Sequence, residues 1–331
     1  MNIKNSITEL IGHTPLLELH GFEKKMKLQA NIIVKLEYFN VNQSSKDRTA
    51  LQIIEDAEKS GQLKKSDLIV ETTSGNTGIS LASIAAAKGY RFLAYMQDGV
   101  SRERFQNIEA FGSETILFSD VPEVKAALER SNNNFVIGLS ALKEQLRGQE
   151  GIFYTDQCYT DSNQKAHRES TGPEIWEDTE GTVDIVVGAV GTGGTISGTG
   201  QYLKEKNPNI KIVAVEPENE YSFAEDDVER GVIDGIERIS DVPKEAVPGT
   251  VDLNVIDEIM EVSAENAFIT ARLVARTDGI LIGSSSGAAL YAGQELAKRE
   301  ENRGKRIVVI APDTGLRYLS TKLFREEYKN D

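Results

Sequence analysis

Residues 184–195 read Asp-Ile-Val-Val-Gly-Ala-Val-Gly-Thr-Gly-Gly-Thr, an unusually apolar run that meets a glycine-rich loop. An apolar stretch without alternation is typical of a strand buried on both faces of a parallel sheet. A helical pattern containing glycines follows the loop, so the segment predicts a strand, a loop at its carboxyl end and a helix. This strand–loop–helix unit decides the fold class.

The same scheme recurs on both sides of this segment. Repetition of strand, loop and helix indicates parallel sheets covered by helices, so we expect an α/β fold with two doubly wound domains and mostly parallel sheets. Further strands are predicted at 31–36, 68–70, 91–96, 115–118, 211–215, 279–282 and 306–310. Further helices are predicted at 79–88, 101–111 and, as two charged helices, over roughly 121–149, with an irregular acidic loop at 216–241.

The composition excludes several classes of protein. The chain has 331 residues, which favours two domains, and its 39% hydrophobic and 27% charged residues exclude wholesale disorder. The formal net charge of −15 argues against nucleic acid or an anionic membrane as a partner. The single cysteine, Cys158, suits a reducing compartment and is predicted to be a packed thiol. Without a signal-peptide core or an apolar run of membrane-spanning length, we expect a cytoplasmic protein.

Four loops rich in Gly, Ser and Thr follow predicted strands, at 72–78, 191–195, 283–287 and 312–315. Ligands of such folds bind beyond the carboxyl ends of the strands, so we expect the loops to form one site. Gly191–Thr195 opens a helix, where backbone N–H groups and the helix dipole suit a phosphate. The loop is neither a dinucleotide fingerprint, whose third glycine would fall on Ile196, nor a P-loop. It predicts a small phosphorylated cofactor, or else only a tight turn.

The stretch Asn40–Arg48 places a lysine at the mouth of a helix. An apolar stripe follows, and Ser44 and Asp47 have the spacing of a capping box, which predicts Lys46 in the first helical turn. The positive end of a helix lowers the cost of deprotonating this lysine, which suits Schiff-base chemistry. The alternative is a solvated lysine beside a solvated Asp47.

Other polar residues have both functional and structural interpretations. Thr73–Thr77 offers hydroxyls, an amide and N–H groups suited to a carboxylate or a ring hydroxyl, or else simple turn chemistry. Ser285 and Ser286 have the composition of a helix cap. The histidines lack metal-ligand spacing, so we expect no metal; they are His13, His20 and His167.

Several motifs, taken in order, resemble one family. They are Ile11–Pro15, Lys46–Arg48, Thr73–Gly78, Thr171–Trp176, Gly191–Thr195, Ser285–Ala288 and Arg317–Thr321. This set is similar to the pyridoxal-phosphate enzymes of the cysteine synthase and cystathionine β-synthase group, and the resemblance runs nearly end to end. It implies the pyridoxal-phosphate fold type II, which is tryptophan synthase β-like. It also implies a smaller, mobile N-terminal domain over 40–155 and a larger cofactor-phosphate domain over 156–331 plus roughly 12–39.

The resemblance also implies roles for single residues. Lys46 would form the internal aldimine with pyridoxal 5′-phosphate and then take the α-proton, and Asn76 would contact the ring oxygen of the cofactor. Ser285 would face the pyridine nitrogen; a serine there leaves the ring neutral, which suits elimination from Cβ to an aminoacrylate. The substrate carboxylate would be held by Thr73, Ser74, Thr77 and Gln157, and the phosphate by Gly191, Thr192, Gly193, Gly194 and Thr195.

Three segments depart from the family pattern. Asn40-Val41-Asn42 stands where the family has Asn-Pro-Gly, and Gln97-Asp98-Gly99 where it has the Pro-Glu of a mobile flap. Asp234-Gly235-Ile236-Glu237 stands where the family commonly has Gln-Gly-Ile-Gly, and nearby acidic residues are Glu225, Asp226, Asp227 and Glu229. A carboxylate at Asp234 would repel hydrosulfide and could deprotonate water, or it would only hydrogen-bond its own loop.

The implied function is β-replacement in cysteine metabolism, with sulfide entering or leaving. The default reaction joins O-acetylserine and sulfide into L-cysteine and acetate. The alternative converts L-cysteine and water into L-serine and hydrogen sulfide, with Asp234 as the base. A catalytically silent relative is disfavoured by the intact Lys46 and Asn76, and a nicotinamide dehydrogenase by the missing fingerprint. The family suggests a homodimer, with serine acetyltransferase as a candidate partner.

Overall fold

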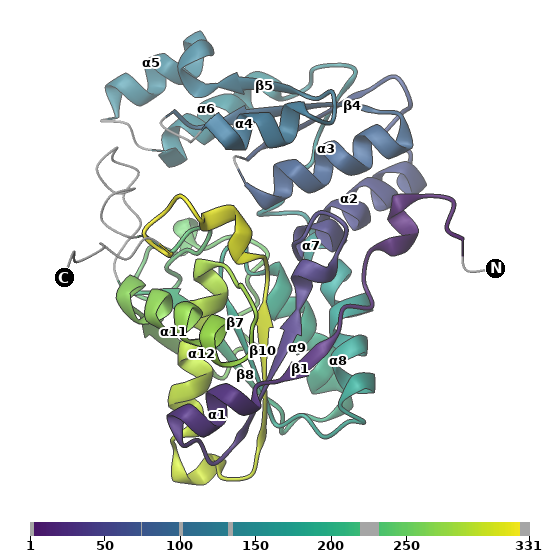
Figure 1. Ribbon diagram of the computed structural model, residues 1–331. Helices are drawn as coiled ribbons and strands as arrows, with labels where there is room; N and C mark the ends of the chain where they lie inside the picture. Colours follow the sequence, from purple (N-terminus) through teal and green to yellow (C-terminus); the bar gives the residue numbers. More distant parts are fainter. Residues whose placement is uncertain (1–2, 74, 99–101, 132–134, 219–231, 325–331) are drawn as a thin grey trace. The chain divides into compact units, whose positions relative to one another are not determined.

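The structure is a computed structural model that describes residues 3–73, 75–98, 102–131, 135–218 and 232–324 (Figure 1). The chain divides into two compact units. Unit 1 comprises Met1–Ile11 and Lys46–Ser162, and unit 2 comprises Gly12–Ser45 and Asn163–Asp331. The chain therefore changes unit at 11/12, 45/46 and 162/163, where the sequence placed the boundaries at roughly 11/12, 39/40 and 155/156.

Unit 1 is built on a four-stranded parallel sheet in the order β5-β4-β3-β6. Its strands are β3 (Leu68–Thr72), β4 (Arg91–Met96), β5 (Glu114–Leu117) and β6 (Ile152–Tyr154). Its helices are α2 (Lys46–Ser60), α3 (Asn76–Lys88), α4 (Arg102–Glu109), α5 (Pro122–Arg130) and α6 (Phe135–Leu146), with short 3₁₀ turns at Ile7–Leu10 and Phe118–Asp120. The strand–helix alternation predicted for this part of the chain is confirmed.

The sheet of unit 1 buries both of its faces, because successive side chains of a strand point to opposite sides. Ile69 packs in the cluster that includes α2 and α3 residues, whereas Val70 packs with residues of α5 and α6. On β4, Phe92 joins the first cluster and Leu93 joins the second. The result is a sheet between two helical layers, as Figure 1 shows for this unit.

Unit 2 contains a six-stranded sheet in the order β1-β2-β10-β7-β8-β9, parallel except for the antiparallel edge pair β1–β2. Its strands are β1 (Leu16–Glu18), β2 (Asn31–Leu36), β7 (Ile185–Ala189), β8 (Lys211–Pro217), β9 (Glu258–Val262) and β10 (Arg306–Ala311). Its helices are α1 (His20–Met26), α8 (Gly172–Asp178), α9 (Gly194–Lys206), α11 (Ala264–Thr277) and α12 (Ser284–Ala297). Helix α7 (Asp161–Ala166) spans the boundary, and shorter turns lie at Glu37–Phe39, His167–Thr171, Lys244–Ala246, Glu300–Asn302 and Gly315–Tyr318.

The second sheet is also covered on both faces. Val213 and Val215 of β8 pack in the cluster that contains α11 and α12 residues, whereas Ile212 and Ala214 pack in the cluster that contains α8 and α9 residues. The same alternation runs along β7 and β10. This double burial explains why the strand over residues 185–189 is apolar without interruption, as the sequence indicated.

Some predicted elements are wrong. Residues 279–282 form no strand: only Ile282 makes an isolated bridge, to Thr314. Strand β9 was not predicted, and helix α6 is largely apolar rather than charged. The predicted acidic loop starts later than expected because β8 runs to Pro217, and residues 219–231 of that loop lie outside the described residues.

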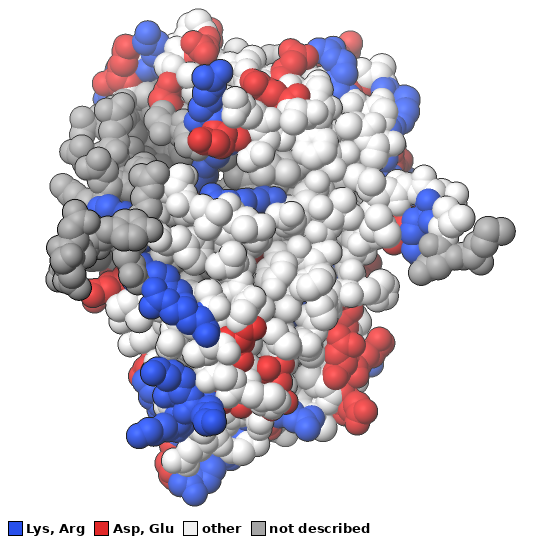
Figure 2. All heavy atoms as spheres, in the orientation of Figure 1, with Lys and Arg blue, Asp and Glu red and all other residues white. Residues whose placement is uncertain are grey.

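Side chains of both signs lie on the face drawn in Figure 2. Basic ones gather at its lower left and acidic ones at its lower right, with a broad uncharged area across the middle, so no single sign covers this face. Among the described helices, none combines the length and apolar character needed to cross a membrane. An anionic ligand therefore requires a site built locally from N–H and O–H donors.

Candidate active site

Three of the four predicted strand-end loops belong to unit 2, and a fifth segment links them. Gly283 N donates to Asp313 O at 3.2 Å, which joins the loops that follow 282 and 311. The segment 234–237 then connects these loops to the glycine-rich loop: Asp234 N donates to Ser284 Oγ at 3.1 Å, and Glu237 N donates to Val190 O at 2.7 Å. The loop at 72–78 belongs to unit 1.

The glycine-rich loop is fixed by close packing. Gly193 has a φ of +85°, which favours glycine, and a Cβ on Gly194 would lie 2.1 Å from Oδ1 of the buried Asn163. A Cβ on Gly191 would lie 2.4 Å from Gly235 O. Helix α9 begins at Gly194, so its first N–H groups have no partner within the helix and suit an anion. The loop is a tight turn whose backbone suits a phosphate, and its role as the phosphate site stays a prediction.

The threonines of this loop are held by buried polar residues of unit 2. Asn163 Nδ2 donates to Thr192 Oγ1 at 2.9 Å. His167 Nε2 lies 3.1 Å from Thr195 Oγ1, and His167 Nδ1 lies 2.8 Å from Thr171 Oγ1. His167 begins a π-helical turn, a geometry often found at functional sites. Sequence reasoning treated His167 as one of three scattered histidines, because nothing local signals a partner 28 residues away.

The side-chain hydroxyl of Ser285 is available to bond a ligand. It is the second residue of α12 and only 7% exposed, and it has no hydrogen-bond partner among the described residues. The helix-cap interpretation is wrong, because the N-cap is Gly283 and no side chain makes a cap bond. Ser286 Oγ is buried and likewise unpartnered in the described part of the chain. A free hydroxyl at a helix start can donate to an acceptor nitrogen of a ligand.

Lys46 is the first residue of α2 and is half-buried, so its placement in the first helical turn is confirmed. The predicted capping box is wrong, because Ser44 Oγ is buried without a hydrogen-bond partner and Ser44 instead bridges to Asp313. The alternative prediction of a solvated Asp47 is also wrong, because its side chain is fully buried and accepts a hydrogen bond from Ser80 Oγ at 2.6 Å. The acid beside Lys46 therefore anchors α2 to α3.

In unit 1, two of the predicted carboxylate-binding residues are in contact. Thr77 Oγ1 donates to Gln157 Oε1 at 2.6 Å, although 80 residues separate them. Thr73 Oγ1 accepts from Gly78 N at 3.2 Å, which is the turn chemistry that the sequence also allowed. Asn76 is the half-buried first residue of α3, and Ser74 lies outside the described residues.

Glu71 is a residue of this region that sequence reasoning missed. Its carboxylate is 2% exposed and accepts from Thr72 N at 2.7 Å, Thr155 Oγ1 at 2.6 Å and Gln157 N at 2.9 Å. Burial raises the pKa of Glu71 to about 7, although these hydrogen bonds oppose the rise. A glutamate inside an apolar strand gives no local signal of such partners.

The acidic segment of unit 2 carries two carboxylates near the glycine-rich loop. Asp234 is half-buried, and its backbone N–H donates to the side chain of Ser284, the residue before Ser285. Solvent reaches the Glu237 side chain, yet protein atoms crowd its carboxyl and desolvation raises its pKa to about 7. The nearby acids Glu225, Asp226, Asp227 and Glu229 lie outside the described residues.

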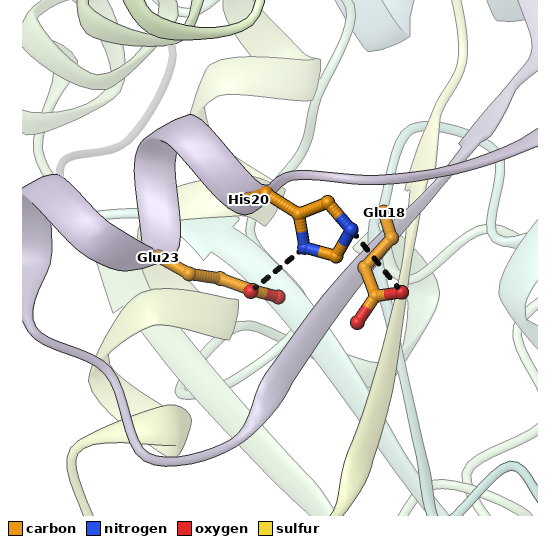
Figure 3. A group of neighbouring side chains, drawn as sticks. All are labelled: Glu18, His20 and Glu23. Carbon is orange, nitrogen blue, oxygen red and sulfur yellow. Dashed lines mark ion pairs between the residues drawn. The ribbon is translucent and has the colours of Figure 1, made fainter.

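Among the described residues, one group of potential metal ligands lies on unit 2, away from these loops in sequence (Figure 3). His20 stands between two carboxylates, with Nε2 3.8 Å from Glu18 Oε2 and Nδ1 3.5 Å from Glu23 Oε2. The two ring nitrogens of a histidine point in different directions, so one ion cannot use both contacts. The other oxygens of the acids accept from Asn31 and Ile32, so we interpret the group as a surface ion-pair cluster.

Comparison with known proteins gives consistent matches. The family described as "Pyridoxal-phosphate dependent enzyme" matches residues 7–313. The cysteine synthase of Staphylococcus aureus is 39% identical over 321 residues, covering 97% of both chains. O-acetyl serine sulfhydrylase isoform 3 from Entamoeba histolytica superposes with a TM-score of 0.83 at 38% identity, covering 100% of this chain and 94% of that one. A hydrogen sulfide-producing enzyme from Fusobacterium nucleatum has a TM-score of 0.80 at 35% identity, covering 96% and 99%.

Proposed function

Because the chain belongs to the pyridoxal-phosphate dependent enzymes and is of the cysteine synthase type, we propose that it joins O-acetylserine and sulfide into L-cysteine and acetate. The observation that carries this proposal is the nearly buried, unpartnered hydroxyl of Ser285. A neutral donor at the pyridine nitrogen gives a moderate electron sink, which suits loss of a group from Cβ.

Each unit, taken by itself, offers groups that suit the cofactor. In unit 2, the N–H groups of Gly191–Thr195 suit its phosphate, and the Ser285 hydroxyl suits its ring nitrogen. In unit 1, Lys46 suits its aldehyde and Asn76 its ring oxygen. When bound, pyridoxal phosphate supplies the electron sink for reaction at Cα and Cβ. Lys46 Nζ would hold the cofactor and would accept the proton from Cα of the substrate.

The substrate carboxylate is assigned to Thr73, Ser74, Thr77 and Gln157. The contact between Thr77 and Gln157 supports this assignment, because it brings two loops of unit 1 together at the ends of neighbouring strands. Hydroxyl and amide donors at strand ends bind a carboxylate without requiring a cation. Their task is to orient the amino acid so that its Cα–H bond faces the lysine.

A second candidate reaction converts L-cysteine and water into L-serine and hydrogen sulfide. The position of Asp234 favours it: the backbone of this residue is bonded to Ser284, and the next residue packs against Gly191. A carboxylate at this place would repel hydrosulfide anion and could accept a proton from water. The similar enzyme from Fusobacterium nucleatum is named as hydrogen sulfide-producing.

The products distinguish the two reactions. We would identify by mass spectrometry what the purified holoenzyme makes from L-cysteine alone and from O-acetylserine with sulfide. Cysteine formation from the second mixture with no serine from the first supports the leading proposal, and the reverse supports the second. Formation of neither product overturns both.

The role of Asp234 is tested by Asp234→Asn, with Asp241→Asn as the control because the Asp241 carboxylate is 89% exposed. For the second reaction, we expect Asp234→Asn to reduce sulfide release from cysteine about 100-fold. Unchanged sulfide release in this variant would show that Asp234 does not activate water.

A further inference from the structure

Glu71 occupies a place that the proposed reaction does not use. It is the fourth residue of β3, and its carboxylate faces donors from two strand ends. Oε1 accepts from Thr72 N at 2.7 Å, while Oε2 accepts from Thr155 Oγ1 at 2.6 Å and from Gln157 N at 2.9 Å. No cationic side chain of the described residues pairs with it. A buried anion held only by neutral donors depends on each of them.

These contacts tie together the loops assigned to the substrate carboxylate. Strands β3 and β6 are parallel neighbours, so their carboxyl ends lie at the same edge of the sheet of unit 1. Gln157 donates its backbone N–H to Glu71 and accepts with its side chain from Thr77. Thr72, bonded to the other oxygen, directly precedes Thr73. One carboxylate therefore sets the positions of both loops.

The surroundings of Glu71 make its charge sensitive to pH. Burial raises the pKa of Glu71 to about 7, and the charge of Asp156 acts in the same direction. Asp156 is itself paired with Lys143 of α6 at 2.8 Å. Tyr154 of β6 also faces the group, and burial followed by the charge of Glu71 raises the pKa of that phenol, so it stays neutral. The raised pKa of Glu71 therefore lies near neutral pH, whereas the raised pKa of Tyr154 keeps that phenol protonated.

Protonation has a defined path through the hydrogen bonds. A proton on Oε2 turns that atom into a donor, and Thr155 Oγ1, 2.6 Å away, is its acceptor. The proton of the Thr155 hydroxyl can then turn to Val70 O, 3.4 Å away. Gln157 N–H loses its anionic acceptor in this arrangement, and a hydrogen bond to a charged group is among the stronger ones.

We propose that Glu71 is a positioning residue: as a carboxylate it holds Gln157 and the Thr72–Thr73 turn in the arrangement that receives the substrate carboxylate, and when protonated it releases them. This inference rests on the proposed assignment of the carboxylate to Thr73, Thr77 and Gln157. It predicts that affinity for the carboxylate of an amino acid falls as pH drops through neutrality, apart from any effect of pH on the amine.

The test compares two ligands of the holoenzyme by absorbance titration. L-alanine carries the amine and the carboxylate but no leaving group, and ethylamine carries only the amine. The ratio of their dissociation constants cancels the deprotonation that both amines require. In the parent protein we expect the preference for L-alanine to fall about 10-fold between about pH 8 and about pH 6.

Glu71→Gln should show the weaker preference at both pH values, because the neutral amide accepts with only one atom. Glu58→Gln is the control; Glu58 lies on α2 and pairs with Lys88 at 2.7 Å, outside these loops. Thr155→Val, which keeps the carboxylate and removes one donor, should move the midpoint of the preference to higher pH. Because Thr155→Val keeps the Glu71 carboxylate, it tests the proposal even if Glu71→Gln does not fold.

Three results would overturn the proposal. They are a preference for L-alanine that does not vary with pH in the parent, a Glu71→Gln preference equal to that of the parent, and a midpoint unmoved in Thr155→Val. A parent that does not respond to L-alanine would overturn the carboxylate assignment itself. A parent that binds L-alanine but forms neither cysteine nor sulfide would overturn the proposed reaction and leave the role of Glu71 supported.

Discussion

The two strand-end loops that carry most of the candidate site are held in opposite ways. In unit 2, Gly191–Thr195 is fixed by packing, since a Cβ at Gly194 would collide with Asn163. In unit 1, the backbone N–H groups of Thr72 and Gln157, from two strand ends, both donate to the single carboxylate of Glu71. A steric restraint at Gly194 does not depend on pH, whereas a hydrogen bond to the titratable carboxylate of Glu71 does.

The difference matches what each loop is proposed to bind. A phosphate that stays bound through many turnovers requires N–H groups that do not move. An amino acid that enters and leaves at each turnover requires donors that can be ordered and released. We infer that rigidity and adjustability are divided between the two units, and the following predictions test that division.

The largest effect is expected from Lys46→Ala. This residue starts the longer segment of unit 1 and is proposed to bind the cofactor and to move the Cα proton, so turnover should fall about 1000-fold or more. Lys59→Ala, in the last turn of the same helix and exposed, is the control. Steady-state rates and the visible absorbance of the bound cofactor would be measured. A Lys46→Ala variant with ordinary turnover would remove unit 1 from the chemistry.

The second effect separates the packed loop from the adjustable one. In Gly194→Ala the new Cβ would lie 2.1 Å from Asn163 Oδ1, so we expect the free energy of unfolding to fall by about 1–3 kcal/mol and cofactor affinity to weaken. In Gly75→Ala the nearest atom is 3.8 Å away, so folding should be unaffected. Thermal unfolding and cofactor titration would measure both variants. Equal tolerance at the two positions would contradict the division.

The third effect concerns pH and stability in unit 1. The folded pKa of Glu71 is about 7, above the ordinary value of 4.5, so the unfolded chain releases this proton first as pH rises. The free energy of unfolding should therefore fall between about pH 4.5 and about pH 7, by at most about 3 kcal/mol. Denaturant unfolding of Glu71→Gln should lack this slope. A slope equal to that of the parent would show that another group titrates.

Unit 2 should respond to acid in the opposite direction. Hydrogen bonds from Arg299 and Lys211 lower the pKa of Glu258 to about 2, so its contribution is present above the unfolded value of 4.5 and is lost as pH falls toward 2. The group is partly exposed, and solvent screening limits the loss to about 1–2 kcal/mol. The unfolding free energy of Glu258→Gln and of the parent should converge at low pH. A difference in unfolding free energy that stays constant with pH would contradict the lowered pKa of Glu258.

The smallest effect is expected at the surface cluster of His20. Its side chain is 76% exposed, so His20→Ala should change the free energy of unfolding by less than about 0.5 kcal/mol. Added zinc should leave the melting temperature of the parent unchanged. A rise that is present in the parent and absent in His20→Ala would instead establish a metal site there.

The strands that are buried on both faces of their sheet could be predicted from the sequence. Strands β2 and β4 have the predicted bounds because their apolar runs are flanked by polar turns. Strand β9 was not predicted, because it lies at the edge of the sheet and the side chains of its Glu-Ile-Met-Glu-Val sequence are only partly buried. The positions of Lys46, Gly191–Thr195 and Ser285 at the starts of helices followed from the chemistry of the loops. The predicted cap hydrogen bonds were wrong.

The rest of the site depends on contacts between distant positions. Glu71 meets Thr155 and Gln157 across 84 and 86 residues, and no local pattern marks such a partner. His167 reaches Thr195 in the same way. Sequence motifs identify residues that would touch a ligand, whereas the residues that orient them are recognised only from the folded chain.

The strand order of unit 2 has a consequence for the chain during its synthesis. Strand β2 pairs only with β1 and β10, and β10 comes 270 residues after the end of β2, counting from Leu36 to Arg306. A two-stranded hairpin is marginal by itself, so β1 and β2 leave the ribosome long before the strand that secures them exists. The segment 46–162, which contains every strand of the other sheet, is complete by then. We expect unit 1 to fold first, and the antiparallel pair β1–β2 to become stable only when β10 emerges.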